Sequence, residues 1–160
     1  MRIGITGHQN LGDEGSVSWI RESICQALTS DNASSGYSCL AIGADKVFVG
    51  VFHQRGLPFI AVIPCALYEQ TFKTAEDVAS YHLILSQAKE VIRLPFTKPS
   101  EEAFMAGGTK IVDCCDKLYA AWNGKPAKGL GGTADVVRYA QENGKRVLHM
   151  NPLDRSIQLL

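Results

Sequence analysis

Short apolar runs alternate with longer amphipathic segments along the chain, and this alternation limits the folds available to it. The short runs are bounded by Gly, Pro or Asn, as is typical of buried parallel strands. They predict six strands, at residues 2–6, 37–42, 58–63, 90–94, 117–122 and 146–149. Strands that alternate with helices favour an α/β fold: a single doubly wound, Rossmann-like domain with a mostly parallel sheet of about six strands.

The amphipathic segments predict five helices, at residues 14–28, 45–55, 74–89, 100–115 and 133–143. In the first of them, Val17, Ile20 and Ile24 recur at helical spacing and define one apolar face. The pair Gly107-Gly108 stands inside the fourth, where each glycine weakens a helix by roughly 1 kcal/mol relative to alanine. A close approach of another helix or of a ligand would explain that cost.

The chain contains no linker, repeat or low-complexity stretch, so we expect one domain at residues 1–152 followed by a short tail at 153–160. The tail ends in the apolar residues Ile157, Leu159 and Leu160. It docks either on its own domain or on a partner subunit, and the sequence leaves both alternatives open.

Charge and cysteine usage narrow the classes of function. Sixteen Lys and Arg residues balance sixteen Asp and Glu residues. A net charge of zero argues against binding through phosphate electrostatics alone, so we do not expect nucleic acid as a partner. No apolar run approaches the ~18–20 residues of a membrane span, and the first residues predict a strand, not a signal peptide. The five cysteines lack CxxC or zinc-ligand spacing, so we expect a cytoplasmic protein with reduced cysteines and no metal site.

Unusual residues gather where three of the predicted strands end. Gly7 and His8 follow the first strand, residues 43–45 follow the second, and a long glycine-rich loop, residues 123–132, follows the fifth. Ligands of open parallel sheets bind beyond the carboxyl ends of the strands, because helix N-termini converge there. The sequence therefore predicts a ligand site at this edge of the sheet.

The glycine-rich loop is the strongest of these signals. Gly131 and Gly132 allow a close approach of the backbone to a ligand, and the Thr133 hydroxyl either caps the next helix or bonds a phosphate oxygen. Lys125 and Lys128 add positive charge beside it. The spacing matches neither the P-loop nor GxGxxG, and a flexible surface loop with a threonine cap explains these residues equally well.

The other candidates each have a plain structural alternative. His8 could donate to a phosphate or a sugar hydroxyl, or be exposed beside a tight turn. Asp45 could bind a ribose hydroxyl, although the local sequence favours a helix N-cap. Trp122 could stack on a base, but packing in the core is the commoner outcome for it and for Tyr68 and Phe72.

Three segments occur in the same order in the SLOG superfamily: Gly4-Ile5-Thr6-Gly7-His8, Gly43-Ala44-Asp45, and AAWNGKPAKGLGGTAD at residues 120–135. This superfamily is a Rossmann-like group that contains the Smf/DprA proteins and the LOG phosphoribohydrolases. The chain resembles it over nearly its whole length, and most closely its small stand-alone bacterial members. The resemblance implies a pocket for a nucleotide or a nucleotide-derived ligand, and we assign no cofactor.

The shared motifs also imply where each candidate residue lies. Gly7 and His8 would face the phosphate or the sugar of the ligand, and Gly43, Ala44 and Asp45 would face its sugar side. Gly131, Gly132 and Thr133 would face the phosphate. Trp122 and Lys125 would lie at the border of the same cleft.

The LOG enzymes cleave the N-glycosidic bond of nucleoside 5′-monophosphates and use the motif PGGxGTxxE. Here no Pro precedes the glycines, Val136 occupies the position of the glutamate, and Asp135 comes one residue early. On a helix that offset turns a side chain by about 100°. The candidate catalytic carboxylates of a hydrolase are therefore Asp45, Glu102 and Asp135.

Two functions follow from these observations. The first is binding of a nucleotide or nucleotide-derived ligand without turnover, which the missing glutamate favours. The alternative is hydrolysis of an N-glycosidic bond in a nucleoside 5′-monophosphate. Because SLOG proteins are commonly oligomeric, the resemblance also implies a homo-oligomer, a dimer or larger, and the apolar tail is compatible with one.

Overall fold

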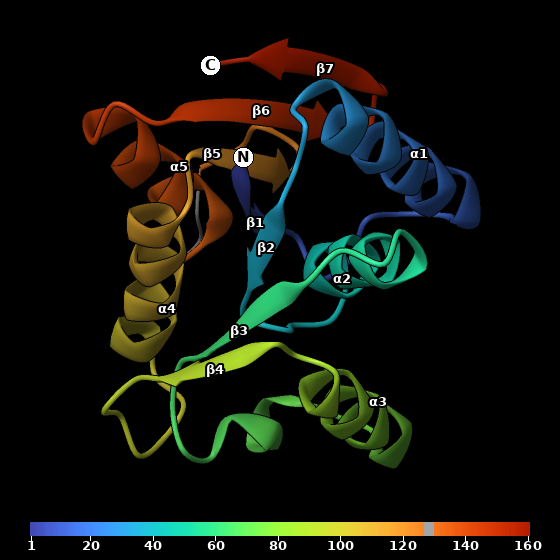
Figure 1. Cartoon of the computed structure of the whole chain (residues 1–160). Coiled ribbons are helices and arrows are strands. Elements are labelled where there is room, and N and C mark those ends of the chain that lie inside the picture. The colour runs from blue at the N-terminus through green and yellow to red at the C-terminus, as the bar shows by residue number, and fades with distance from the viewer. Residues whose placement is uncertain (127–129) are drawn as a thin grey trace.

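A seven-stranded sheet forms the centre of the fold. The computed structural model describes residues 1–126 and 130–160. The strands are β1 (Arg2–Gly7), β2 (Ser35–Ser38), β3 (Phe59–Ile63), β4 (Glu90–Arg93), β5 (Lys117–Ala121), β6 (Arg146–Asn151) and β7 (Ser156–Leu159). They lie in the order β4-β3-β2-β1-β5-β6-β7 (Figure 1), with β1 to β6 parallel and β7 antiparallel to β6. The predicted fold class is confirmed.

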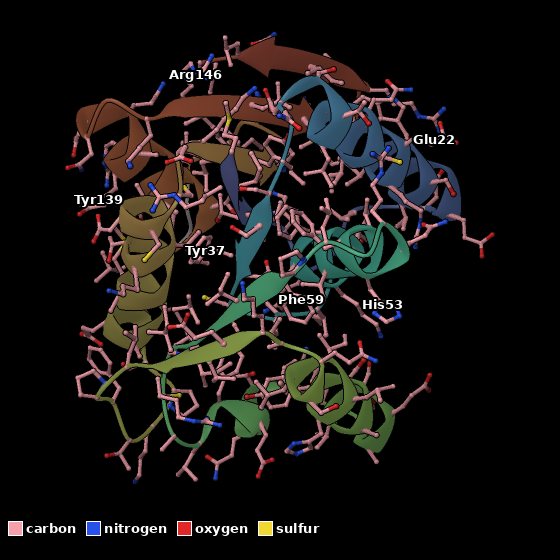
Figure 2. The ribbon with its side chains drawn as sticks, viewed as in Figure 1. Glu22, Tyr37, His53, Phe59, Tyr139 and Arg146 are labelled. Carbon is pink, nitrogen blue, oxygen red and sulfur yellow. The ribbon has the colours of Figure 1, made fainter. Side chains whose placement is uncertain are left out.

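Helices cover both faces of the sheet. One face carries α1 (Glu14–Ser30), α2 (Ala44–Gln54) and α3 (Ala75–Ser86), and the other carries α4 (Glu101–Cys114) and α5 (Thr133–Glu142). Successive strand residues point to opposite faces. Figure 2 shows this on neighbouring strands, where Tyr37 points toward α4 and Phe59 lies on the side of α2. No helix in the described part of the chain is both long enough and apolar enough to cross a membrane.

Two elements differ from the sequence prediction. The second strand was expected at residues 37–42 but ends at Ser38, because the Ser38 hydroxyl accepts from the Leu40 amide (3.0 Å) and turns the chain away. Leu40 then has a φ of 58°, which a strand does not contain. The tail supplies a seventh strand where about six were expected, since β7 pairs Leu159 with Leu148 of β6. The tail thus docks on its own sheet.

The glycine pair inside α4 marks a close approach of two helices. A Cβ added at Gly108 would overlap Cγ2 of Val136 on α5, and one added at Gly107 would lie 3.0 Å from Sγ of Cys39. Gly4 on β1 has the same role below α4, because a Cβ there would lie 2.6 Å from Cγ2 of Ile111. The cost of glycine in the helix is therefore offset by close packing.

A buried polar cluster holds the opposite edge of the sheet, where the strands begin. Lys117 on β5 donates to both carboxylate oxygens of Asp31 (2.9 and 2.8 Å), and the Tyr119 hydroxyl donates to the same carboxylate (2.7 Å). Burial alone would raise the pKa of Asp31, but the hydrogen bonds from Lys117 and Tyr119 bring it below its usual value. The cluster ties the end of α1 to the start of β5.

Alanine substitutions at two helical glycines should have opposite effects on stability. Gly108→Ala should lower the free energy of unfolding by about 1–2 kcal/mol, because overlap with Val136 outweighs the gain in helix propensity. Gly50→Ala in α2 is the matched control, since its Cβ would meet only the Arg21 guanidinium at 3.8 Å. That variant should gain up to about 1 kcal/mol. Urea unfolding measures both, and a gain at Gly108 would contradict the packing argument.

Candidate functional site

A cavity of about 590 Å³ opens at the carboxyl edge of the sheet. Loops that follow β1, β2, β3 and β5 meet there, together with the first turns of α4 and α5. Its volume is within the range of small-molecule sites. The predicted site residues that line it are Gly7, His8, Asp45, Trp122, Lys125, Gly131, Gly132 and Thr133.

The turn after β1 is held tightly between two neighbours. A Cβ added at Gly7 would lie 2.5 Å from Cβ of Ala44 and 2.6 Å from the carbonyl oxygen of Ala121, so only glycine fits. The His8 amide donates to the Ala121 carbonyl (2.9 Å), and the His8 carbonyl accepts from the Ala44 amide (3.1 Å). With its backbone fixed in this way, the His8 side chain lies in the cavity wall.

Gly43 and Ala44 lie behind the wall and do not line the cavity. Gly43 is the N-cap of α2 with a φ of 80°, and a Cβ on it would overlap the carbonyl oxygens of His8 and Gln9. Ala44 is fully buried. These two residues let the start of α2 pack against the turn after β1, so they shape the site and do not face a ligand in it.

Asp45 is a buried carboxylate in the cavity wall. It is 5% exposed and accepts a hydrogen bond from the Ser38 hydroxyl (2.7 Å). Burial raises the pKa of its carboxyl to about 6, although hydrogen bonds from Ser38 and from backbone amides of residues 39–41 oppose this shift. Asp45 is not the helix N-cap that the local sequence favours, because Gly43 occupies that position. It instead organises the loop between β2 and α2.

The N-terminus of α5 opens into the cavity. Gly132 is its N-cap and no side chain caps it, whereas Asp13, Thr74 and Ser100 cap α1, α3 and α4. Gly131 has a φ of 82° and packs on α4, where a Cβ would lie 2.8 Å from the Met105 amide nitrogen. Thr133, whose hydroxyl was predicted either to cap this helix or to face a ligand, is not the cap, and the residue lines the cavity. Lys128 and Gly129 lie outside the described residues.

Trp122 is fixed at the border of the cavity. Its indole N–H donates to the Lys125 carbonyl (2.8 Å), and its own carbonyl accepts from the Nε2 of His149 (2.8 Å). The His149 ring also packs against the indole, with centroids 4.5 Å apart. These contacts hold Trp122 in one orientation while it still lines the cavity.

The three candidate carboxylates separate in space. Glu102 is exposed in the first turn of α4 and does not line the cavity. Asp135 accepts from the Gly131 amide (3.2 Å) and the Arg138 guanidinium (2.8 Å), so it holds the glycine-rich loop. Of the three candidates, only Asp45 is among the described residues that line the cavity. In the described ranges, no three His, Cys, Asp or Glu side chains gather as a metal site would require.

Aromatic side chains form a part of the cavity wall that was not predicted from the sequence. Tyr68 belongs to a short 3₁₀ helix, η1 (Tyr68–Thr71), and lines the cavity together with Phe72 and Phe104. Tyr68 and Phe72 were expected to pack in the core, and they do, but they also line the cavity. Both follow β3 at its carboxyl end, on the edge where the glycine loops meet. That position was the signal that could have identified them.

No protein-family model and no curated protein matches the chain. Among solved structures, DprA from Streptococcus pneumoniae is 20% identical with a TM-score of 0.68, covering 92% of this chain and 49% of its own. DprA from Helicobacter pylori is 18% identical with a TM-score of 0.67, covering 93% of this chain and 64% of its own. The molybdenum cofactor binding protein from Rippkaea orientalis is 14% identical with a TM-score of 0.56, covering 94% and 76%. The chain thus spans about half to two thirds of the DprA chains.

One expectation about partners is wrong. Zero net charge was taken to argue against nucleic acid, yet the H. pylori DprA, which has this fold, binds single-stranded DNA. Charge summed over a whole chain says little about a local binding surface, so nucleic acid stays among the candidate partners. The structural neighbours agree with the motif resemblance on the fold: the chain has a Rossmann-like fold similar to theirs.

Proposed function

We propose that the cavity binds a nucleotide or nucleotide-derived ligand, with its phosphate at the N-terminus of α5. The observation that carries this proposal is the uncapped start of α5, which opens into a cavity of about 590 Å³ beside Gly131 and Gly132. The first N–H groups of a helix point along its axis and carry a partial positive charge, so an anion is their natural partner.

The charges around the cavity agree with an anionic ligand. Lys125 and His8 lie in its wall, and the carboxylate of Asp45 is occupied by the Ser38 hydroxyl and backbone amides. A side-chain cap at α5 would compete with a ligand, and Gly132 provides none. These features support a site for one phosphate group.

The neighbours with this fold support the same class of ligand. One binds single-stranded DNA and another binds the molybdenum cofactor. Both ligands combine phosphate with heteroaromatic rings. A nucleotide has this combination, either free or as one unit of a single strand.

A carboxylate at the N-cap should block this site without unfolding the protein. Gly132 has an extended backbone (φ −73°, ψ 168°) that aspartate adopts readily. Gly132→Asp should therefore cap α5 and stabilise the fold by a few tenths of a kcal/mol. It should also weaken phosphate-bearing ligands about tenfold or more, because it occupies the N–H groups and repels the anion. Gly132→Ser, a neutral cap, should weaken them less.

Native mass spectrometry measures intact ligand retained by each variant. The probes are the nucleoside 5′-monophosphates, NAD, cyclic dinucleotides and a short single-stranded oligodeoxynucleotide. Retention of none of them by the wild type would overturn the proposed function, and unchanged retention by Gly132→Asp would place the phosphate elsewhere.

Cleavage of an N-glycosidic bond is the second candidate, and the position of Asp45 favours it. In this reaction the bond from C1′ to the base nitrogen breaks, water oxygen bonds to C1′, and the leaving base takes up a proton. A buried carboxylate in the cavity wall could stabilise the positive charge that develops at C1′. At neutral pH a carboxyl with a pKa of about 6 is mostly ionised, as this role requires.

If the protein is a hydrolase, the Asp45→Asn variant should retain intact nucleoside 5′-monophosphate and release no base. Glu102→Gln is the matched control, because Glu102 is exposed outside the cavity, and it should keep full activity. Mass spectrometry of free base measures both. No release by the wild type would leave binding as the function, and release that survives in Asp45→Asn would exclude Asp45.

The raised pKa of Asp45 also predicts how stability depends on pH. Its folded-state pKa of about 6 exceeds the ordinary value of 3.8, so its contribution to stability is complete below about pH 4 and is lost as pH rises through 6. Asp45→Asn does not titrate. Relative to the wild type it should gain about 2 kcal/mol of stability from pH 4.5 to pH 7.5. Urea unfolding over this range measures the difference, which a normal pKa would leave constant.

A further inference from the structure

Three aromatic side chains form one end of the cavity. Tyr68 of η1 meets Phe72 edge-to-face, with ring centroids 5.6 Å apart, and meets Phe104 of α4 at 6.5 Å. All three line the cavity. Aromatic rings in such arrangements present faces and edges on which another flat ring can stack.

The aromatic end and the phosphate end share one helix. Gly131 packs on the backbone of Glu101 and Met105 in the first turns of α4, and Phe104 extends from the same turn into the cavity. Both ends therefore border one continuous cavity, within reach of a single small ligand. Gly108, one turn further along α4, lines the same cavity.

The hydroxyl of Tyr68 distinguishes it from an ordinary core tyrosine. Tyr68 is 5% exposed, and no residue in the described part of the chain hydrogen-bonds its oxygen. In that same part of the chain every fully enclosed polar side-chain atom has a partner, so the Tyr68 oxygen is not fully enclosed, and Tyr68 is a residue that lines the cavity. Burial raises the pKa of Tyr68 well above its usual value, with smaller contributions from the charges of Cys39 and Asp45, so the hydroxyl stays neutral. A hydroxyl that is not enclosed and has no partner in the described part of the protein is free to hydrogen-bond a ligand.

Tyr81 provides an internal comparison. It belongs to the same aromatic cluster, 5.7 Å from Tyr68 and 4.9 Å from Phe72 between ring centroids, and is 6% exposed. It does not line the main cavity. The two tyrosines therefore share burial and packing, and differ in whether the side chain reaches the site.

We propose that the aromatic end of the cavity holds a planar heteroaromatic ring, and that the Tyr68 hydroxyl makes a hydrogen bond to a polar atom on the edge of this ring. The inference deepens the proposed function by assigning the other end of the same ligand, and it rests on the phosphate being bound at α5. Neutral phenol both donates and accepts, so the ring is recognised by a nitrogen, a carbonyl or an exocyclic amine. Nucleobases and pterins have this chemistry.

Isothermal titration calorimetry on the full chain tests this assignment. The probes are AMP, GMP, CMP, UMP and neopterin phosphate, together with ribose 5-phosphate, which lacks a ring base, and adenosine and guanosine, which lack phosphate. The variants are Tyr68→Phe and the control Tyr81→Phe, each of which removes one hydroxyl and keeps the ring. Thermal unfolding confirms that both variants are folded.

The best nucleotide or pterin phosphate should bind more tightly than ribose 5-phosphate. Tyr68→Phe should weaken that ligand by about 3- to 10-fold and leave ribose 5-phosphate unchanged, and Tyr81→Phe should change neither. Preference for nucleotide over pterin phosphate, or the reverse, identifies the source of the ring.

Other results would overturn the assignment. Equal affinity for ribose 5-phosphate and every ring-bearing phosphate, or equal effects of the two tyrosine variants, excludes a ring at Tyr68 while the phosphate site stands. Binding of a nucleoside that depends on Tyr68, without any benefit from phosphate, supports the ring site and overturns the phosphate end of the proposed function. Binding of no probe overturns both.

Discussion

Close packing of α4 is the constraint on which the rest of the structure depends. Glycines stand at its contacts with three neighbours: Gly4 beneath it on β1, Gly108 against Val136 of α5, and Gly131 of the loop against the backbone of its first turns. At each of these contacts a methyl group would overlap or crowd a neighbouring atom. Because protein interiors are packed at nearly crystalline density, such contacts leave little freedom in the position of the helix. The helix then determines where the glycine-rich loop and Phe104 can lie.

The cavity is a consequence of this arrangement. Parallel strands deliver their carboxyl ends to one edge, where the loops after β1, β2, β3 and β5 surround a space bordered by α4 and α5. Polar groups are distributed unevenly around it. The Asp45 carboxylate accepts hydrogen bonds from Ser38 and from backbone amides, whereas the start of α5 has no side-chain cap and the Tyr68 hydroxyl has no partner among the described residues. The groups without protein partners are therefore the ones most available to a ligand.

Much of the site was predictable from the ends of strands. Gly7, His8, Trp122 and the loop at 131–133 were placed on one edge by the rule for parallel sheets, and they do line one cavity. Glu102 and Asp135 were not excluded by sequence, because exposure and side-chain partners depend on packing. Asp135 accepts hydrogen bonds from Arg138 and from the Gly131 amide, and helical spacing alone does not predict either contact.

The sequence by itself determined the fold class, the strand and helix order, and the edge that carries the site, because these follow from local periodicity and from the direction of parallel strands. Tertiary structure alone decided that residues 39–42 leave the sheet, that the tail becomes β7, and that Tyr68 lines the main cavity while Tyr81 does not. Each of these outcomes depends on partners distant in the chain or on the space left between elements. Ser38 bonds Asp45 seven residues away, β7 needs the free edge of β6, and the environment of Tyr68 is completed by α4. Residue type and spacing cannot specify such contacts, since they arise only when the layers pack.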